Sequence, residues 1–220
     1  MYTEDDAKMT RVYLIRHGES AANCGEIFTG QMDFPLSERG HRQAELAGEY
    51  LKDKGIDVIY ASDLIRAYDT AVPTAKKCGL EIIRCPEFRE LNGGKWEGLT
   101  YDQLLERYPT EYPVFVHDFG NASCEGGESI VGMTKRIRGI FDRIVEENDG
   151  KTVAVFTHAC PIRELQCVLC GRPTEDMRDI KWVGNASTTL VECDRGKYNF
   201  AMIGYNGYLA ELATQLPDRV

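Results

Sequence analysis

The 220-residue sequence has no stretch that approaches the roughly 18 consecutive apolar residues of a membrane-spanning helix, so no membrane segment is expected. Its first residues are acidic and include no apolar segment, which is not the pattern of a secretory signal. It also has no internal repeat, low-complexity tract or linker rich in proline and serine. We therefore expect a cytoplasmic protein with a disordered leader over residues 1–10 and a single domain over residues 11–220.

Positive charge is in short supply. The chain has 26 Lys and Arg against 35 Asp and Glu, a formal net charge of −9. A nucleic-acid-binding protein normally presents a basic face, so this composition argues against one. An anionic ligand would have to be attracted by a local cluster of arginines rather than by the whole molecule.

Cysteine is plentiful, but its spacing does not indicate a metal site. Without a secretory signal, the 8 cysteines are expected to be reduced thiols rather than a disulfide framework. Cys167 and Cys170 form a C-x-x-C pair, yet no second pair or histidine stands at zinc-finger spacing. We interpret the pair as two small apolar residues on a helix.

Apolar runs and capping signals predict strands that alternate with helices. The predicted strands cover residues 11–15, 57–61, 80–84 and 151–156, followed by a hairpin over residues 187–193 and 198–203. The predicted helices are one from the N-cap Ser37 to Gly55, one capped by Ser62 or Asp63, residues 100–108, residues 129–147, and one whose first residue is Pro161. Residues 109–123 are predicted to be irregular. This alternation predicts a three-layer α/β/α sandwich with a mainly parallel, mixed central sheet.

Polar residues follow three of these strands directly. Arg16 and His17 come after the first strand, Arg66 lies in the first turn of the helix after the second, and Thr157 and His158 follow the most apolar strand. Ligands of such sheets bind at the carboxyl ends of the strands. The topology therefore permits two histidines and two arginines to meet at one edge of the sheet.

Two arginines decide between the ligands that such a cluster could bind. Guanidinium groups would repel a divalent cation, whereas they match the oxygens of a phosphate in geometry and charge. The pattern therefore predicts a phosphoryl-group site that uses neither a metal nor another cofactor.

His17 is the candidate nucleophile of this site. A neutral imidazole has a lone pair suited to in-line attack on phosphorus, which gives a phosphohistidine. Its other nitrogen must then be held as N–H by an acceptor, for which the Gly18 carbonyl is our candidate. Arg16, Arg66 and protonated His158 would stabilise the charge on the equatorial oxygens. Glycine at position 18 would let the backbone pass close to the anion.

The same residues belong to a series of ordered motifs. In chain order, these are Leu14-Ile15-Arg16-His17-Gly18-Glu19-Ser20 with Asn23, residues 28–33, residues 35–40, residues 61–71, Phe88-Arg89-Glu90-Leu91, residues 96–100, Gly126-Gly127-Glu128-Ser129 and Thr157-His158. Together they resemble the histidine phosphatase superfamily, in its phosphoglycerate mutase-like branch. The resemblance extends over residues 11–203, nearly the whole chain.

This resemblance implies a role for each site residue. His17 would be the phosphorylated nucleophile, and Glu90 would be the acid that protonates the leaving oxygen and then the base that activates water. A dianionic phosphate nearby would favour the protonated carboxyl that an acid needs. The implied phosphate pocket consists of Arg16, Arg66 and His158, with further contacts from Asn23, Thr29, Gly30 and the backbone of Ala159. Ala159 departs from the family, which usually has glycine there, and its methyl group could crowd the pocket.

The resemblance includes both phosphatases and mutases. Mutases of this type have a longer insertion between the acid and the second histidine, with extra basic residues. Here the interval from Glu90 to His158 is short, contains no adjacent arginines and begins with Leu91-Asn92-Gly93-Gly94. The sequence therefore favours a histidine acid-type phosphatase, a phosphomonoester hydrolase. A cofactor-dependent phosphoglycerate mutase and a non-catalytic phosphate-binding or regulatory module are the alternatives.

The leaving group of the substrate is less well defined. We expect a small-molecule phosphate ester, no nucleic-acid or membrane partner, and a monomer or homodimer. Residues 92–128 are predicted to include a lid over the site, because such loops vary with substrate. The aromatic candidates for the outer pocket are Phe28, Trp96, Tyr101, Tyr112, Phe115 and Phe119.

Overall fold

One six-stranded sheet lies at the centre of the computed structural model, which describes residues 9–214. Its strands are β1 (Thr10–Arg16), β2 (Val58–Ala61), β3 (Ile82–Arg84), β4 (Thr152–Thr157), β5 (Thr188–Asp194) and β6 (Lys197–Tyr205). The spatial order is β3-β2-β4-β1-β5-β6. The first four of these strands are parallel to their neighbours, whereas β5 pairs antiparallel with both β1 and β6. The predicted mixed, mainly parallel sheet is confirmed.

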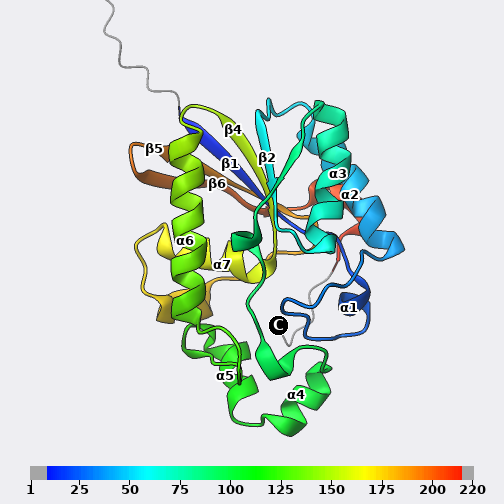
Figure 1. Cartoon of the computed structure of the whole chain (residues 1–220), viewed down its shortest axis with the longest axis vertical. Helices are drawn as coiled ribbons and strands as arrows, with labels where there is room; N and C mark the ends of the chain where they lie inside the picture. The colour runs from blue at the N-terminus through cyan, green and yellow to red at the C-terminus, as the bar shows by residue number, and fades with distance from the viewer. Residues whose placement is uncertain (1–8, 215–220) are drawn as a thin grey trace, which may run out of the picture.

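Helices cover both faces of this sheet (Figure 1). They are α1 (Ala21–Cys24), α2 (Glu38–Leu51), α3 (Ile65–Cys78), α4 (Tyr101–Arg107), α5 (Glu111–His117), α6 (Ile130–Glu147) and α7 (Ala159–Val168). Short 3-10 helices cover Pro86–Phe88, Gly94–Trp96, Phe119–Asn121, Thr174–Asp179 and Gly207–Leu212. Figure 1 shows α2 and α3 on one face, α6 and α7 on the other, and α4 and α5 beyond one end of the sheet. This arrangement is the predicted three-layer sandwich.

Alternating residues of β1 supply two separate hydrophobic clusters. Val12 and Leu14 pack into the cluster that includes Phe141 of α6, and Tyr13 and Ile15 pack into the cluster on the α2 and α3 side. Successive side chains of a strand point to opposite faces, so a strand covered on both faces must be apolar throughout. The short apolar run in the sequence therefore marks a central strand, which begins one residue earlier than predicted, at Thr10. Of the predicted leader, residues 1–8 lie outside the described residues.

Two predicted helix caps are confirmed. The Ser37 hydroxyl accepts a hydrogen bond from the Gly40 N–H at the start of α2, and the Ser129 hydroxyl accepts one from the Gly132 N–H at the start of α6. Each satisfies one of the N–H groups that a helix start leaves without an internal partner.

The cap predicted for α3 is wrong. The N–H of Ile65, the first residue of α3, donates to Asp33 Oδ1 at 2.7 Å, so a segment distant in sequence caps this helix. Ser62 and Asp63 have other partners: the Ser62 hydroxyl contacts His158, and Asp63 forms an ion pair with an arginine. The local capping signal is overridden because both side chains are used in tertiary contacts.

The irregular segment predicted for residues 109–123 is also wrong. It contains α5 and the 3-10 helix Phe119–Asn121. Pro113 lies in the first turn of α5, where a missing N–H leaves no internal hydrogen bond unmade. Pro161 likewise lies in the first turn of α7, two residues after the helix begins at Ala159.

Substitutions on α6 test how the core is partitioned. Phe141 is fully buried, whereas Val131 on the same helix is 56% exposed. Phe141→Ala is expected to lower the free energy of unfolding by about 3–5 kcal/mol, since it removes a ring from a packed core and leaves a cavity. Val131→Ala is the matched control and should change it by less than about 0.5 kcal/mol. Urea denaturation measures both, and equal losses would contradict the described burial.

Candidate active site

The pairing register of two central strands brings the two histidines together. In the parallel pair β1 and β4, Arg16 lies opposite Thr157, so the residues that follow them are neighbours. The His17 N–H donates to the Thr157 carbonyl at 2.9 Å, and the His17 and His158 ring centroids are 5.2 Å apart. The predicted meeting of these strand ends is confirmed.

His17 is held in one tautomer. Its Nδ1 lies 2.7 Å from the Gly18 carbonyl oxygen, the acceptor that we expected. A carbonyl can only accept, so Nδ1 carries the proton and Nε2 keeps its lone pair. Burial, together with the positive charges of Arg66 and Arg16, holds the pKa of His17 well below its usual value. The ring is therefore neutral and can act as a nucleophile at physiological pH.

Two buried guanidinium groups flank the histidines. Arg16 Nη1 donates to the Val183 carbonyl at 2.6 Å, and Arg66 donates to the carbonyls of Met32 and Gly30 at 2.9 and 2.8 Å. The Nε atoms of both arginines are buried and have no hydrogen-bond partner among residues 9–214. Burial lowers the pKa of Arg66 to about 10, so its side chain stays charged at neutral pH. The backbone thus fixes two positive charges beside the histidines.

His158 differs from the prediction in its charge. Its Nε2 lies 2.8 Å from the Ser62 hydroxyl, which sequence reasoning had assigned only to a helix cap. Burial and the positive charge of Arg66 hold the pKa of His158 well below its usual value, so the ring is neutral in the free site. The expected protonated His158 is wrong for this state, because two fixed guanidinium groups disfavour a third positive charge. His158 is fully buried beside His17 and is not part of the cavity wall.

Glu90 lies at the start of α7. Its carboxylate accepts hydrogen bonds from the Leu91 N–H at 2.9 Å and from the N–H groups of Ala159 and Cys160 at 3.2 Å each. The Ala159 N–H, which the family pattern assigned to phosphate, therefore binds Glu90 instead. Glu90 and His17 both line the same cavity, which places an acid near the nucleophile.

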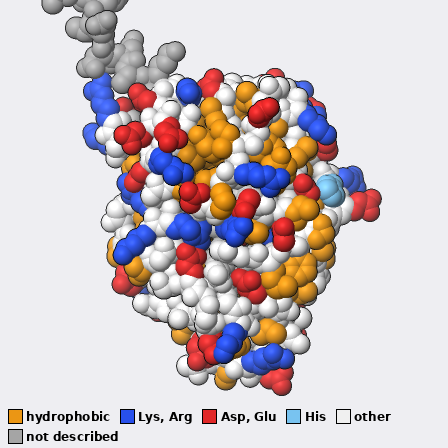
Figure 2. Space-filling view, viewed as in Figure 1, with side chains coloured by type: hydrophobic (Ala, Val, Ile, Leu, Met, Phe, Trp, Pro, Cys, Tyr) orange, Lys and Arg blue, Asp and Glu red, His pale blue; other side chains and the backbone are white. Residues whose placement is uncertain are grey.

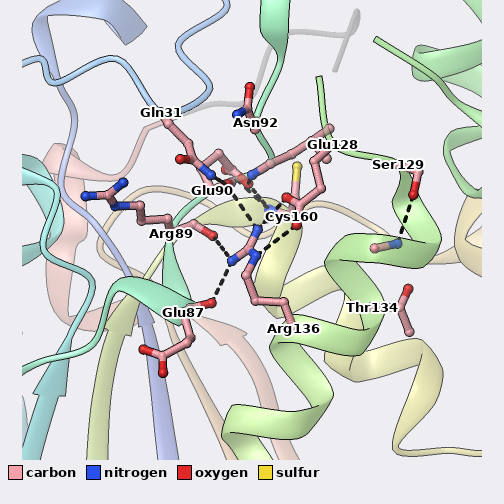
Figure 3. Close-up of polar contacts among 12 residues, drawn as sticks. Gln31, Glu87, Arg89, Glu90, Asn92, Glu128, Ser129, Thr134, Arg136 and Cys160 are labelled. Atoms are coloured by element: carbon pink, nitrogen blue, oxygen red, sulfur yellow. Dashed lines mark hydrogen bonds and ion pairs between the residues drawn. The ribbon is translucent and has the colours of Figure 1, made fainter. Parts of the chain in front are cut away.

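Arg136 of α6 fixes the segment that carries Glu90 (Figure 3). Its guanidinium donates to the carbonyls of Glu87 and Arg89 at 2.6 and 2.9 Å and to that of Glu90 at 3.4 Å. It also forms two hydrogen bonds with the Glu128 carboxylate, at 2.9 and 2.6 Å. Sequence reasoning missed Arg136, since nothing in the sequence links a helical arginine to carbonyls so far away in the chain.

The remaining predicted contacts of the phosphate also line the cavity. These are Asn23, Thr29 and Gly30. Asn23 Oδ1 accepts from the Ser20 N–H at 3.0 Å and from Asn185 Nδ2 at 3.2 Å, so its own amide nitrogen remains a donor at the cavity wall.

Glycine is required at two positions for reasons of space. Gly30 has a φ of +50°, and a Cβ there would lie 2.1 Å from Glu97 Oε1. At Gly18, a Cβ would lie 2.7 Å from the Gly40 carbonyl oxygen. Gly18 thus allows two backbone segments to pack together, and the predicted close approach to an anion is not the reason for it.

Aromatic side chains form the outer wall of the cavity. Four of the six candidates line it: Phe28, Tyr101, Tyr112 and Phe115. Trp96 and Phe119 are fully buried in the core instead. Sequence reasoning missed Ile27, Leu91, Cys160 and Trp182 as lining residues. Burial and the nearby Glu90 carboxylate raise the pKa of Cys160 well above its usual value, so this thiol does not compete with His17 as a nucleophile.

Charge elsewhere does not single out another anion site. Acidic and basic side chains are interspersed over the face shown in Figure 2. Within residues 9–214, no group of three or more His, Cys, Asp or Glu is arranged to hold a metal ion, and no helix is long and apolar enough to cross a membrane. The 8 cysteines all lie in the described range and are free.

The family of the chain follows from comparison with known proteins. A model of the histidine phosphatase superfamily (branch 1) matches residues 12–206, and the chain belongs to this family. Family membership makes it an enzyme of phosphoryl transfer, a phosphatase or a mutase.

Three relatives illustrate the range of the family. The chain is 34% identical to Phosphoserine phosphatase 1 of Hydrogenobacter thermophilus, over 74% of this chain and 77% of that protein. It is 33% identical to the protein named Probable phosphoglycerate mutase GpmB in Yersinia pestis, over 84% and 85% of the two chains. The structure of a mycobacterial glucosyl-3-phosphoglycerate phosphatase superposes with a TM-score of 0.84 at 29% identity, covering 90% of this chain and 100% of that one.

The neutral histidines make stability depend on pH. Their pKa values in the folded state lie below the unfolded value of 6.5, so the unfolded chain binds more protons in acid. Their contribution to stability is complete above pH 6.5 and is lost as the pH falls below it. The free energy of unfolding should drop by up to about 1.4 kcal/mol per pH unit for each histidine.

Urea denaturation between about pH 7.5 and pH 5.5 measures this slope. His17→Gln and His158→Gln should each make it shallower, whereas His41→Gln, on the exposed side of α2, should not. An unchanged slope in both buried-site variants would contradict the neutral assignment.

Proposed function

We propose that the chain is a phosphomonoester hydrolase of the histidine acid phosphatase type, which forms a covalent phosphohistidine on His17. The observation that carries this proposal is the neutral, Nδ1-anchored His17 beside two fixed guanidinium groups. Such a site has a nucleophile with a free lone pair and a fixed positive charge for the phosphoryl oxygens. The substrate is a small-molecule phosphate ester.

The reaction has two displacements at phosphorus. His17 Nε2 attacks the phosphorus while the bond to the leaving oxygen breaks, and Glu90 gives that oxygen its proton. Glu90 then takes a proton from water, whose oxygen attacks the phosphorus, and the P–N bond breaks to return the lone pair to Nε2. Arg16 and Arg66 stabilise the equatorial oxygens in both steps, and His158 adds to this charge when the bound dianion favours its protonated form.

The other groups of the cavity bind and enclose the ester. Asn23, Thr29 and the backbone of Gly30 would contact the phosphoryl oxygens, as the family pattern implies. The segment 92–128, which contributes Tyr101, Tyr112 and Phe115 to the cavity, would be the lid of this site. The free cysteines support placement in the reducing cytoplasm, as a monomer or homodimer.

Hydrolysis is favoured over the mutase reaction by the charges of the cavity wall. Among its described residues, the cations are Arg16 and Arg66, and both are engaged at the phosphoryl site. A mutase that acts on phosphoglycerates also has to bind a substrate carboxylate, and neither a lysine nor a third arginine lines this wall. Water is then the acceptor of the phosphoryl group.

His17→Asn tests the covalent mechanism. Loss of the nucleophile should lower phosphate release from 4-nitrophenyl phosphate by about 10⁴-fold or more, while His41→Gln keeps wild-type activity. Activity should persist in a metal chelator. Unchanged release in His17→Asn would refute the covalent mechanism, and rapid interconversion of phosphoglycerates with 2,3-bisphosphoglycerate and little phosphate release would show a mutase.

Glu90→Gln tests the proton donor. An alkoxide leaving group needs a proton, whereas 4-nitrophenolate leaves readily without one. The variant should therefore lose about 10²–10⁴-fold in kcat/KM for benzyl phosphate and much less for 4-nitrophenyl phosphate. Glu106→Gln, at an exposed position of α4, is the control. Equal losses on both esters would argue against Glu90 as the acid.

A further inference from the structure

The cavity has a charged floor and an uncharged outer wall. Arg16, His17 and Arg66 lie at the floor, and the outer wall consists mainly of aromatic and aliphatic side chains. Neither arginine can swing outward without breaking its hydrogen bonds to backbone carbonyls, and both are more than nine-tenths buried. The positive charge is therefore confined to the place where the phosphoryl group binds.

The charge nearest to the leaving group is negative. Among the described residues of the cavity wall, Glu90 is the acid, and three backbone N–H groups hold its carboxylate in place. A carboxylate or second phosphate on the leaving group would face this side chain and the aromatic wall without a cation to balance it. An unbalanced charge taken out of water into such surroundings weakens binding strongly.

The aromatic wall is nearly continuous. The planes of Tyr101 and Tyr112 differ by 17°, those of Tyr112 and Phe115 by 12°, and those of Phe115 and Trp182 by 28°. Tyr112 and Phe115 are buried, whereas Tyr101 and Trp182 are half-buried and present ring surface at the cavity. Near-parallel rings of this kind suit a flat aromatic group better than a compact polar one.

Trp182 is held in place from behind. The Arg163 guanidinium lies 4.2 Å from its ring centroid, and Phe119 packs edge-on at 5.4 Å. Arg163 itself donates to the carbonyls of Ile180 and Met177 at 2.9 and 2.6 Å. The ring is thus fixed before a ligand arrives, and stacking on it costs little loss of side-chain freedom.

We propose that the substrates of this site are phosphomonoesters whose leaving group is uncharged and carries an aromatic ring next to the ester carbon, such as benzylic or nucleoside-like alcohols. This inference rests on the proposed phosphatase function. It separates the chain from relatives named for phosphoserine and for glucosyl-3-phosphoglycerate, compounds that carry a carboxylate.

Two matched pairs of alkyl esters test the proposal on the wild-type enzyme. Benzyl phosphate should exceed cyclohexylmethyl phosphate in kcat/KM by about fivefold or more, since ring stacking is lost in the second ester. The carbamoyl ester 4-carbamoylbenzyl phosphate should exceed 4-carboxybenzyl phosphate by about tenfold or more, because the two differ mainly in charge. Equal values within either pair would overturn the corresponding part of the proposal.

Variants of the wall assign the effect to its residues. Trp182→Leu should lower kcat/KM for benzyl phosphate about tenfold with little change for methyl phosphate, and Trp182→Phe should restore most of it. Ile27→Lys adds a cation at the half-buried rim and should favour the carboxy ester over the carbamoyl ester relative to wild type, whereas the uncharged Ile27→Met should not. A Trp182→Leu loss that is equal on methyl phosphate would show a structural effect only.

Failure of this proposal is distinguishable from failure of the proposed function. If no ester releases phosphate in a His17-dependent manner, the phosphatase function itself is wrong. If phosphate is released through His17 but 4-carboxybenzyl phosphate is as good a substrate as its carbamoyl partner, only the substrate class is wrong.

Discussion

The hydrogen bond from His17 Nδ1–H to the Gly18 carbonyl determines what the rest of the site can do. It leaves the Nε2 lone pair free, and burial beside two guanidinium groups keeps the ring neutral. The β1–β4 register places this ring next to His158. A shift of one residue would turn His17 to the other face of the sheet, so the fold and the chemistry depend on the same strand pairing.

The charged groups around His17 are held by backbone atoms. Carbonyl oxygens orient the guanidinium groups of Arg16, Arg66 and Arg136, and backbone N–H groups orient the Glu90 carboxylate. These groups are oriented during folding, so little reorganisation is needed when a substrate binds. The same fixation confines positive charge to the floor of the cavity, which is why the charge of the leaving group should matter.

The sequence was sufficient for the features that local patterns encode. The central strands, the strand-end positions of His17 and His158 and the terminal hairpin follow from apolar runs and turn signals. Contacts between distant segments have no such signal. Asp33 caps α3 in place of Ser62, and Arg136 reaches carbonyls more than forty positions earlier in the chain. The neutral state of His158 likewise depends on burial, which no residue pattern reports.

The position of the phosphoryl group on the trapped intermediate tests the central claim most directly. Wild-type enzyme can be quenched during turnover, denatured in base and examined by ³¹P NMR against chemically phosphorylated histidine standards. We predict an acid-labile phosphoryl group on Nε2 of His17, because Nδ1 is occupied by its bond to Gly18. A phosphoryl group on Nδ1, or one bound through oxygen or sulfur to another residue, would contradict the account.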